Sequence, residues 1–192
     1  MTKFVVLAHE APTRAKINLN NLAGEGRIDL VARTVNSALL KSHGIREENE
    51  LFLIFQDELV IHFNGEEVGG VNPDERSIAG LLNRAIKQRY REGEKVSHGV
   101  KVKEKGLGQL LESFEEEVFV LKEGGRSLPG SGPGEDAVFV LSDHRDFKNE
   151  ELEALNSAGA EEVSVGPEVI HTDDAVAVVN NFFDTAGFRE YG

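Results

Sequence analysis

Cysteine is absent from this chain of 192 residues, and so is any hydrophobic run long enough to cross a membrane. Without thiols there can be no disulfide, no thiolate zinc site and no cysteine nucleophile. A membrane helix needs about 18 or more apolar residues in a row, and residues 1–9 turn polar too soon for a signal peptide. We therefore expect a cytoplasmic protein with no membrane partner.

Several familiar ligand motifs are also missing. Neither G-x-x-x-x-G-K-[ST] nor G-x-G-x-x-G occurs, which disfavours nucleoside triphosphates and dinucleotides as ligands. The six histidines form no i, i+4 pair on a predicted helix, so we expect no metal site. Ser142, Asp143 and His144 are adjacent and lack the G-x-S-x-G elbow. Because neighbours on a strand point to opposite faces, these three residues do not predict a hydrolytic triad.

Positive charge is scarce and unevenly distributed. The chain carries a formal net charge of −13, yet residues 76–105 contain nine basic and three acidic side chains. From charge alone, this basic segment is either an ordinary solvated face or a surface that contacts nucleic-acid phosphates. The nine side chains are Arg76, Arg84, Lys87, Arg89, Arg91, Lys95, Lys101, Lys103 and Lys105.

Apolar strands alternate with amphipathic helices, which predicts an α/β fold with a mostly parallel sheet and helices on both faces. No repeat or linker divides the chain, so we expect one domain over residues 1–192. The predicted strands are 3–9, 51–55, 58–63 (an edge strand or hairpin arm), 100–102, 118–121, 137–144 and 163–165. The predicted helices are 27–43, 77–91 (with Ser77 as one possible cap), 106–114, an exposed acidic helix 148–158, and a buried helix to 184, capped by Thr172 or Asp173. A flexible loop is predicted for 122–136.

Three strands in the second half of the chain end in loops rich in glycine and small polar residues. These loops follow Leu121, Leu141 and Val165. The carboxyl ends of neighbouring parallel strands meet at one edge of a sheet, where α/β proteins bind small ligands. The sequence therefore predicts a crevice suited to a nucleoside-like ligand at this edge.

Three motifs stand out by their order and spacing. They are Asn72-Pro-Asp-Glu-Arg-Ser77 at the start of a helix, Phe139-Val-Leu-Ser-Asp-His144 with Asp146-Phe147 after it, and Val165-Gly-Pro followed by a helix with Asn181-x-x-Asp184. Together they resemble the archaeal tRNA pseudouridine N1-methyltransferases, a family of the SPOUT class of α/β-knot methyltransferases. The resemblance covers the whole chain. Near relatives of that family methylate a pseudouridine of small-subunit ribosomal RNA.

The resemblance implies S-adenosylmethionine (SAM) as methyl donor and a trefoil knot formed by about residues 117–192. It implies a homodimer in which the last helix packs across the two-fold axis. The family commonly has a histidine and a tyrosine where this chain has Asn180 and Phe182. By position, the cofactor-binding residues would be Leu121, Leu141, Ser142, Gly166, Pro167, Ile170, His171 and Thr172.

The resemblance also implies that pseudouridine 54 in the T loop of tRNA is the substrate. Asn72, Asp74 and Arg76 would then face the RNA. The N1 proton of pseudouridine must leave before N1 can attack, so a carboxylate base and a cation that stabilises the developing anion are needed. Our candidates are Asp57 or Asp74 as base and Arg76 as the cation, although a turn residue, a helix cap and a surface pair are the ordinary roles of such residues. The expected RNA-binding residues are Asn72, Arg76, Arg84, Lys87, Arg89 and Arg91.

Other functions remain open at this stage. The chain could methylate a pseudouridine of ribosomal RNA, or it could be a non-catalytic RNA-binding or assembly module with the same fold. A small-molecule methyltransferase would leave the basic segment as a solvated face. Binding of SAM and binding of tRNA distinguish these possibilities.

Overall fold

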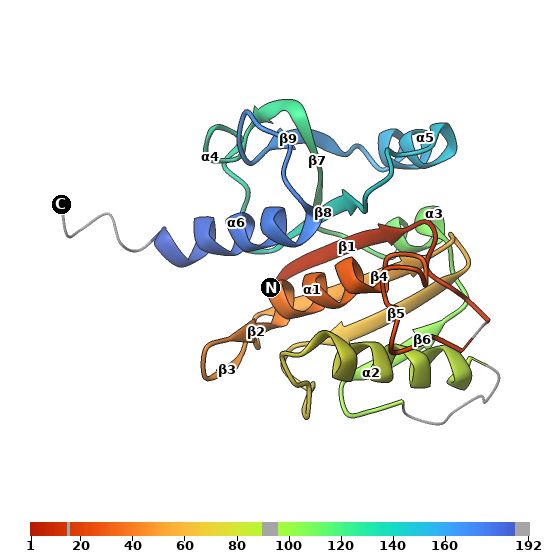
Figure 1. Ribbon diagram of the computed structural model, residues 1–192. Helices are drawn as coiled ribbons and strands as arrows, with labels where there is room; N and C mark the ends of the chain where they lie inside the picture. The colour runs from red at the N-terminus through yellow and green to blue at the C-terminus, as the bar shows by residue number, and fades with distance from the viewer. Residues whose placement is uncertain (15, 90–95, 187–192) are drawn as a thin grey trace.

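Seven strands in the described part of the chain form one sheet in the order β6-β5-β4-β1-β8-β7-β9 (Figure 1), and two short strands form a separate pair. The computed structural model describes residues 1–14, 16–89 and 96–186. β4, β1, β8, β7 and β9 are parallel neighbours, whereas β5 and β6 add to β4 in antiparallel fashion. The mostly parallel sheet is thus confirmed, and the predicted hairpin arm is β5, with β6 outside it. The strands are β1 (Thr2–Ala8), β4 (Asn49–Phe55), β5 (Leu59–Asn64), β6 (Val100–Lys103), β7 (Glu117–Ser127), β8 (Ala137–Ser142) and β9 (Glu161–Ser164).

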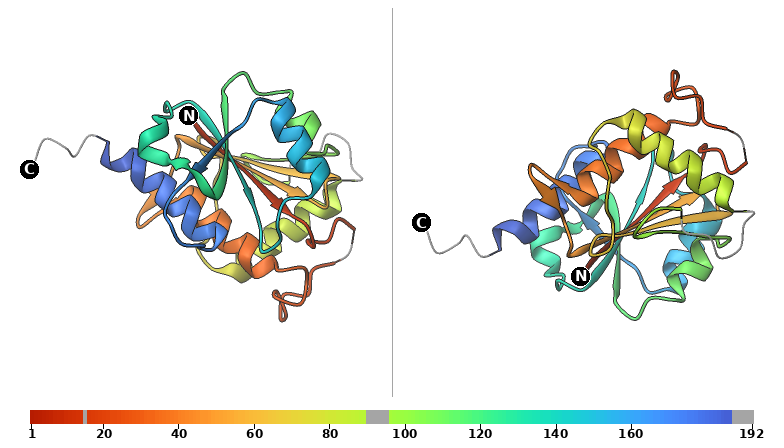
Figure 2. Two further views of the ribbon diagram at one scale, coloured as in Figure 1. Left: turned by 90° about the horizontal axis from the view of Figure 1, so that it is seen from above. Right: turned by 90° about the horizontal axis from the view of Figure 1, so that it is seen from below.

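Helices cover both faces of the sheet, as Figure 2 shows. α1 (Ile28–Leu39), α2 (Glu75–Gln88) and α6 (Thr172–Thr185) lie on one face, and α3 (Leu107–Leu111) and α5 (Asn149–Ser157) lie on the other, with the short α4 (Leu128–Ser131) beside β7. Successive residues of β1 enter opposite cores: Phe4 and Val6 pack under α1, while Val5 and Leu7 face α3 and α5. In the described part of the chain, no helix is long and apolar enough to cross a bilayer.

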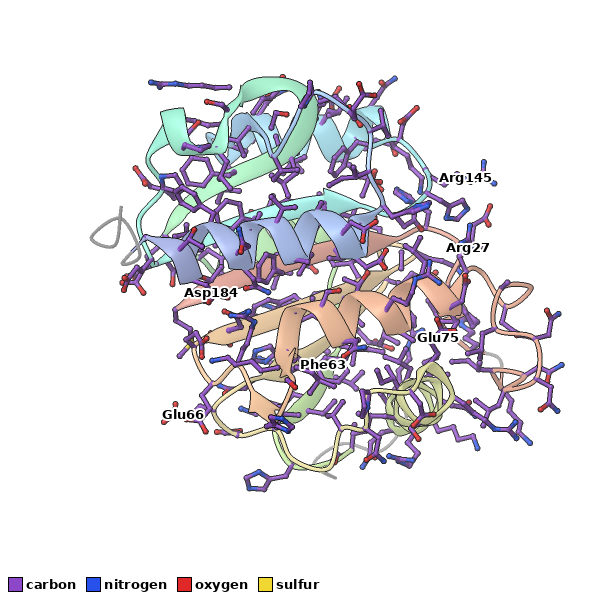
Figure 3. The ribbon with its side chains drawn as sticks, turned by 60° about the vertical axis from the view of Figure 1, so that its left-hand side comes forward. Arg27, Phe63, Glu66, Glu75, Arg145 and Asp184 are labelled. Carbon is purple, nitrogen blue, oxygen red and sulfur yellow. The ribbon has the colours of Figure 1, made fainter. Side chains whose placement is uncertain are left out.

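α1 and α6 lie side by side, and both begin at the carboxyl edge of the parallel strands (Figures 1 and 3). Ala175, Val176 and Val179 of α6 are buried, whereas Val178 is 38% exposed, so the helix predicted to be buried exposes this valine. Two arginines hold α6 near its ends: Arg33 contacts Asp173 at 3.1 Å, and Arg46 contacts Asp184 at 2.7 Å.

Two predicted segments have different boundaries in the structure. The helix expected over 27–43 ends at Leu39, because Leu40 is extended and β2 (Leu40–Lys41) turns back onto β3 (Gly44–Ile45). The expected loop 122–136 begins as a continuation of β7: after an irregularity, Arg126 and Ser127 pair with β9 again. Gly125 permits this return, since a Cβ there would lie 2.6 Å from the backbone of Val163. α4 follows directly.

A buried pair of asparagines connects α6 to the rest of the core. Asn49 Nδ2 donates to Asn180 Oδ1 at 2.9 Å and to the carbonyl of Ala38 at 2.7 Å. Asn180 Nδ2 donates to the carbonyl of Ser37 at 2.9 Å. Asn180 therefore has both of its amide atoms occupied, its Oδ1 by Asn49 of β4 and its Nδ2 by Ser37 of α1.

We expect Asn180→Ala to lower the free energy of unfolding by about 2–3 kcal/mol, because it removes the acceptor of one Asn49 N–H and the donor to the Ser37 carbonyl. Urea unfolding followed by circular dichroism measures this loss. Asn181→Ala is the matched control, since Asn181 is the next residue of the same helix and is exposed. Equal unfolding midpoints for the two variants would contradict the prediction.

Candidate functional site

A cavity of about 510 Å³ lies at the carboxyl ends of β8 and β9, beside the irregularity of β7 that follows Leu121. The loops predicted after Leu141 and Val165 converge there, because β8 and β9 flank β7 in the sheet. The third predicted loop is different, since the lining residues Lys122 and Glu123 belong to β7. Leu30 of α1 and Ala175 of α6 complete the wall. Of the predicted cofactor-binding residues, the cavity is lined by Leu121, Leu141, Ser142, Gly166, Ile170, His171 and Thr172. Pro167 is not among the lining residues, although Gly166 and Glu168 on either side of it are.

Short polar contacts shape the cavity wall. Thr172 Oγ1 donates to the carbonyl of Ser142 at 2.7 Å, which joins the start of α6 to the end of β8. Ser164 Oγ donates to the carbonyl of Gly166 at 2.5 Å and accepts from its N–H at 3.2 Å. A Cβ built on Gly166 would meet no atom within 4 Å. The backbone at Gly166 therefore borders open space, as close approach to a ligand requires.

The predicted cap of α6 was wrong. His171 occupies the N-cap position and its side chain makes no capping bond. The Thr172 hydroxyl is used by Ser142, and the Asp173 carboxylate pairs with Arg33, so neither side chain caps the first turn. The N–H groups in the first turn of α6 therefore lie beside the cavity and have no side-chain cap. Such uncapped N–H groups favour binding of a negatively charged group of a ligand.

His9, Asp143 and Glu151 form a buried cluster at the same edge of the sheet. His9 Nδ1 lies 2.9 Å from Asp143 Oδ1, and His9 Nε2 lies 3.0 Å from Glu151 Oε2. The side chains of the three residues are 7%, 2% and 5% exposed. The hydrogen bond to Asp143 raises the pKa of His9, although burial opposes this and Glu151 adds to it. Burial alone would raise the pKa of Asp143, but hydrogen bonds from His9 and the Arg145 N–H hold it below its ordinary value.

Sequence reasoning missed this cluster. We expected α5 to be an exposed acidic helix, but Glu151 is buried, because its carboxylate accepts from the Lys148 N–H at the start of the helix and faces His9. Glu151 stands at the N3 position, where a glutamate often turns back to the first N–H groups of a helix. That spacing was the only available signal, and it does not indicate the histidine 142 residues earlier.

Exposed cationic side chains lie on one face of the helix α2. Arg76, Arg84 and Lys87 recur on the same side of the helix and are exposed. Within the described ranges, no ion pair involves Arg84 or Lys87. Arg89 is different, because its guanidinium contacts Glu104 and lies 3.5 Å from Glu58. Asn72 is exposed just before α2, and Arg91 lies outside the described residues.

None of the three catalytic candidates lines the cavity. Asp57 accepts from the Leu107 N–H at 2.6 Å, at the start of α3. Asp74, and not Ser77 as expected, caps α2 by accepting from the Ser77 N–H at 2.8 Å. The side chain and the N–H of Ser77 lower the pKa of Asp74, which makes it a weaker base. Arg76 donates to Asn20 Oδ1 at 3.1 Å and is otherwise exposed.

One guanidinium connects the helix that carries the exposed cations to the helix beside the cavity. Arg33 of α1 lies 3.5 Å from Glu75 in α2 and 3.1 Å from Asp173 in α6. It also lies 3.4 Å from Asp29 in its own helix. Figure 3 shows Glu75, Arg27 and Arg145 toward the same end of the molecule, opposite Asp184. The described residues contain no cluster of His, Asp or Glu arranged to hold a metal ion.

A mostly parallel sheet with helices on both faces and a cavity at its carboxyl edge defines an α/β protein that binds a small ligand. The solved structure of Nep1 from Archaeoglobus fulgidus, bound to S-adenosylhomocysteine, has the same fold: the TM-score is 0.68, with 95% of this chain and 97% of that chain covered at 17% identity. The chain belongs to the family described as "Putative SAM-dependent RNA methyltransferase", whose family model matches residues 1–188.

Curated relatives match this chain along its full length. A protein of Haloferax volcanii is 39% identical over 201 residues and one of Halobacterium salinarum is 41% identical over 199 residues, with 100% of each chain covered. Both are named tRNA (pseudouridine(54)-N(1))-methyltransferase. Membership of the family confirms the resemblance seen in the motifs.

Proposed function

We propose that this protein transfers a methyl group from SAM to N1 of pseudouridine 54 in the T loop of tRNA. The observation that carries the proposal is the full-length match to relatives named for this reaction, together with a cavity where the family requires a donor site. The protein would act in the cytoplasm on tRNA, as a single domain with a knot in about residues 117–192.

The cavity has the properties that a donor site needs. Its 510 Å³ falls within the range of pockets for small molecules, about 300–1,000 Å³. Backbone at Gly166 is open to a ligand, and Leu121, Leu141 and Ile170 offer apolar surface for a nucleoside. When bound, SAM supplies an activated methyl group on its sulfonium. Ser142, His171 and Thr172 would then orient the donor, with Pro167 shaping the turn.

Methyl transfer of this kind depends mainly on placing the nucleophile in line with the methyl carbon and sulfur. The N1 proton must also leave. Arg76 is the better supported of our catalytic candidates, because its guanidinium is exposed and can stabilise an anionic base. The carboxylates of Asp57 and Asp74 already accept backbone N–H groups, which disfavours them as bases.

Because Arg76 does not line the cavity of its own subunit, the proposal includes a homodimer in which α2 of one subunit approaches the donor of the other. Apolar side chains that a second copy could cover are present near the cavity and on α6. Val169 is 77% exposed, Ile170 41% and Val178 38%. The target base would be turned out of the T loop into the site formed by α2 of one subunit and the cavity of the other.

Labelled SAM and two tRNAs, one with uridine and one with pseudouridine at position 54, test the proposal directly. Label should appear only in the pseudouridine tRNA, as N1-methylpseudouridine after nuclease digestion. SAM and tRNA binding without transfer would instead identify a non-catalytic module, and label confined to ribosomal RNA would overturn the tRNA substrate. A small-molecule methyltransferase would bind SAM without binding tRNA.

The exposed cations of α2 give a second test. We expect the double variant Arg84→Ala, Lys87→Ala to bind tRNA about ten-fold more weakly at low salt, and to reduce the salt dependence of binding by about one unit of log–log slope for each cation removed. Filter binding over a salt series measures both values. The charge-matched control Lys41→Ala, Arg126→Ala removes exposed cations from other elements. Identical slopes for the two double variants would exclude α2 as the phosphate-contacting face.

A further inference from the structure

We propose that His9 is a positioning residue, and that its imidazolium holds the loop of residues 143–147 in the shape that binds the methyl donor. This inference rests on the proposed function. All five residues of that loop line the cavity, so any shift of the loop changes the wall of the donor site. His9 itself does not line the cavity, and it would act through Asp143 and Glu151.

The hydrogen bonds fasten the loop at both ends. At its start, the Asp143 carboxylate accepts from the His9 N–H at 2.8 Å and from the Arg145 N–H at 2.9 Å. Just beyond its end, the Glu151 carboxylate accepts from the Lys148 N–H at 2.7 Å. The imidazole of His9 lies between these two carboxylates. A single side chain that follows β1 thus connects the beginning of the loop to the helix that ends it.

With Asp143 and Glu151 both ionised, this geometry requires a charged imidazole. An ionised carboxylate can only accept hydrogen bonds, and each ring nitrogen of His9 faces one. Only the doubly protonated ring donates to both. Loss of a proton would place a nitrogen lone pair against a buried carboxylate, which is costly in a site that excludes water. We call the two contacts of His9 with Asp143 and Glu151 the clamp. The clamp should hold when His9 is protonated and loosen when His9 is neutral.

Other charged groups surround this cluster. Glu10 contacts Arg145 and lies 3.3 Å from His144. His144 also lies 3.6 Å from Asp143, and the Lys148 ammonium lies 3.9 Å from Glu151. Arg27, at the start of α1, is close enough for Asp143 to contribute to the raised pKa of its guanidinium. His144 is a second histidine in contact with Asp143, so the experiment must separate the two histidines.

The direction of the pH effect follows from the charge. Contact with Asp143 raises the pKa of folded His9 above its ordinary 6.5. The clamp therefore contributes fully below pH 6.5, which is the ordinary value of the unfolded chain, and is lost as the pH rises through the pKa of folded His9. Donor affinity should fall over the same interval.

Calorimetric titration with SAM from about pH 6 to about pH 9 tests the inference. At the low end, His9→Gln should bind about ten-fold more weakly than the wild type, as expected for loss of a charge-assisted hydrogen bond. The SAM affinity of this variant should not fall with pH, because the glutamine amide does not titrate. The variant keeps His144, so a flat profile assigns the fall in the wild type to His9. The wild type and the control His43→Gln, which changes an exposed histidine, should both lose affinity toward the high end.

Glu151→Gln provides a second variant that keeps an acceptor for the Lys148 N–H. Removing one carboxylate should lower the pKa of His9, so that the loss of SAM affinity moves to lower pH. Equal affinity and an equal pH profile for His9→Gln and wild type would overturn the role of His9, as would an unshifted profile for Glu151→Gln. Absence of SAM binding by the wild type at every pH would overturn the proposed function, and this inference with it.

Discussion

Gly166→Val is expected to weaken SAM binding by about 100-fold while the protein still folds. A Cβ at Gly166 would meet no protein atom within 4 Å, so we expect the unliganded protein to accommodate valine. The same open space is the cavity between the loops after β8 and β9. Overpacking by such a group costs up to about 3 kcal/mol, which corresponds to about 100-fold in affinity. Calorimetry with SAM measures the loss.

Gly134→Val is the matched control for this prediction. Gly134 is exposed, also has no atom within 4 Å of a built Cβ, and does not line the cavity. Both variants should unfold at similar temperatures, and only Gly166→Val should lose SAM. Full affinity for SAM in a folded Gly166→Val protein would show that the donor site lies outside this cavity.

Arg76→Ala is expected to reduce the rate of methyl transfer to tRNA by about 100-fold and to leave the dissociation constant of SAM unchanged. The guanidinium would stabilise charge that develops on the base as N1 loses its proton, a contribution that appears only in the transition state. Because Arg76 does not line the cavity, SAM should not sense its removal. Single-turnover rates with saturating tRNA, together with calorimetry, measure the two effects separately.

Two further variants distinguish chemistry from loop packing. Asn20→Ala removes the hydrogen-bond partner of Arg76 but keeps the guanidinium, so its rate should stay close to that of the wild type. Arg76→Lys keeps a positive charge but lacks the planar guanidinium with its paired N–H donors. Its rate should lie between those of Arg76→Ala and the wild type. Parallel losses of rate and SAM affinity in Arg76→Ala would contradict the assigned role.

The sequence was sufficient for the sheet and for the position of the cavity. Apolar runs such as 51–55 and 137–142 have the composition of strands buried on both faces, and their alternation with helices predicts parallel neighbours. Once β7, β8 and β9 are adjacent, their loops must meet at one edge. Seven of the eight residues carried over from the family resemblance line that cavity, although their contacts with SAM stay a prediction.

Boundaries and partners were harder to foresee, because they depend on contacts between distant segments. Residues 122–125 look like a loop, yet β9 pairs with β7 on both sides of them. In the sequence Asp57 is a turn aspartate or a candidate base, whereas in the structure it accepts the N–H of Leu107 at the start of α3. Local composition does not reveal such a hydrogen bond, because the backbone N–H that donates it belongs to a distant element of the chain.

The order and chemical character of the elements were therefore determined by the sequence alone, because hydrophobic periodicity and glycine placement are local properties of the chain. Only the tertiary structure decided which polar side chains became buried partners. His9 and Glu151 are 142 residues apart, and neither resembles a buried residue in its own segment. Folding of β1, β8 and α5 against one another excludes water from both side chains, and the contact between them replaces the hydrogen bonds that each would make to water.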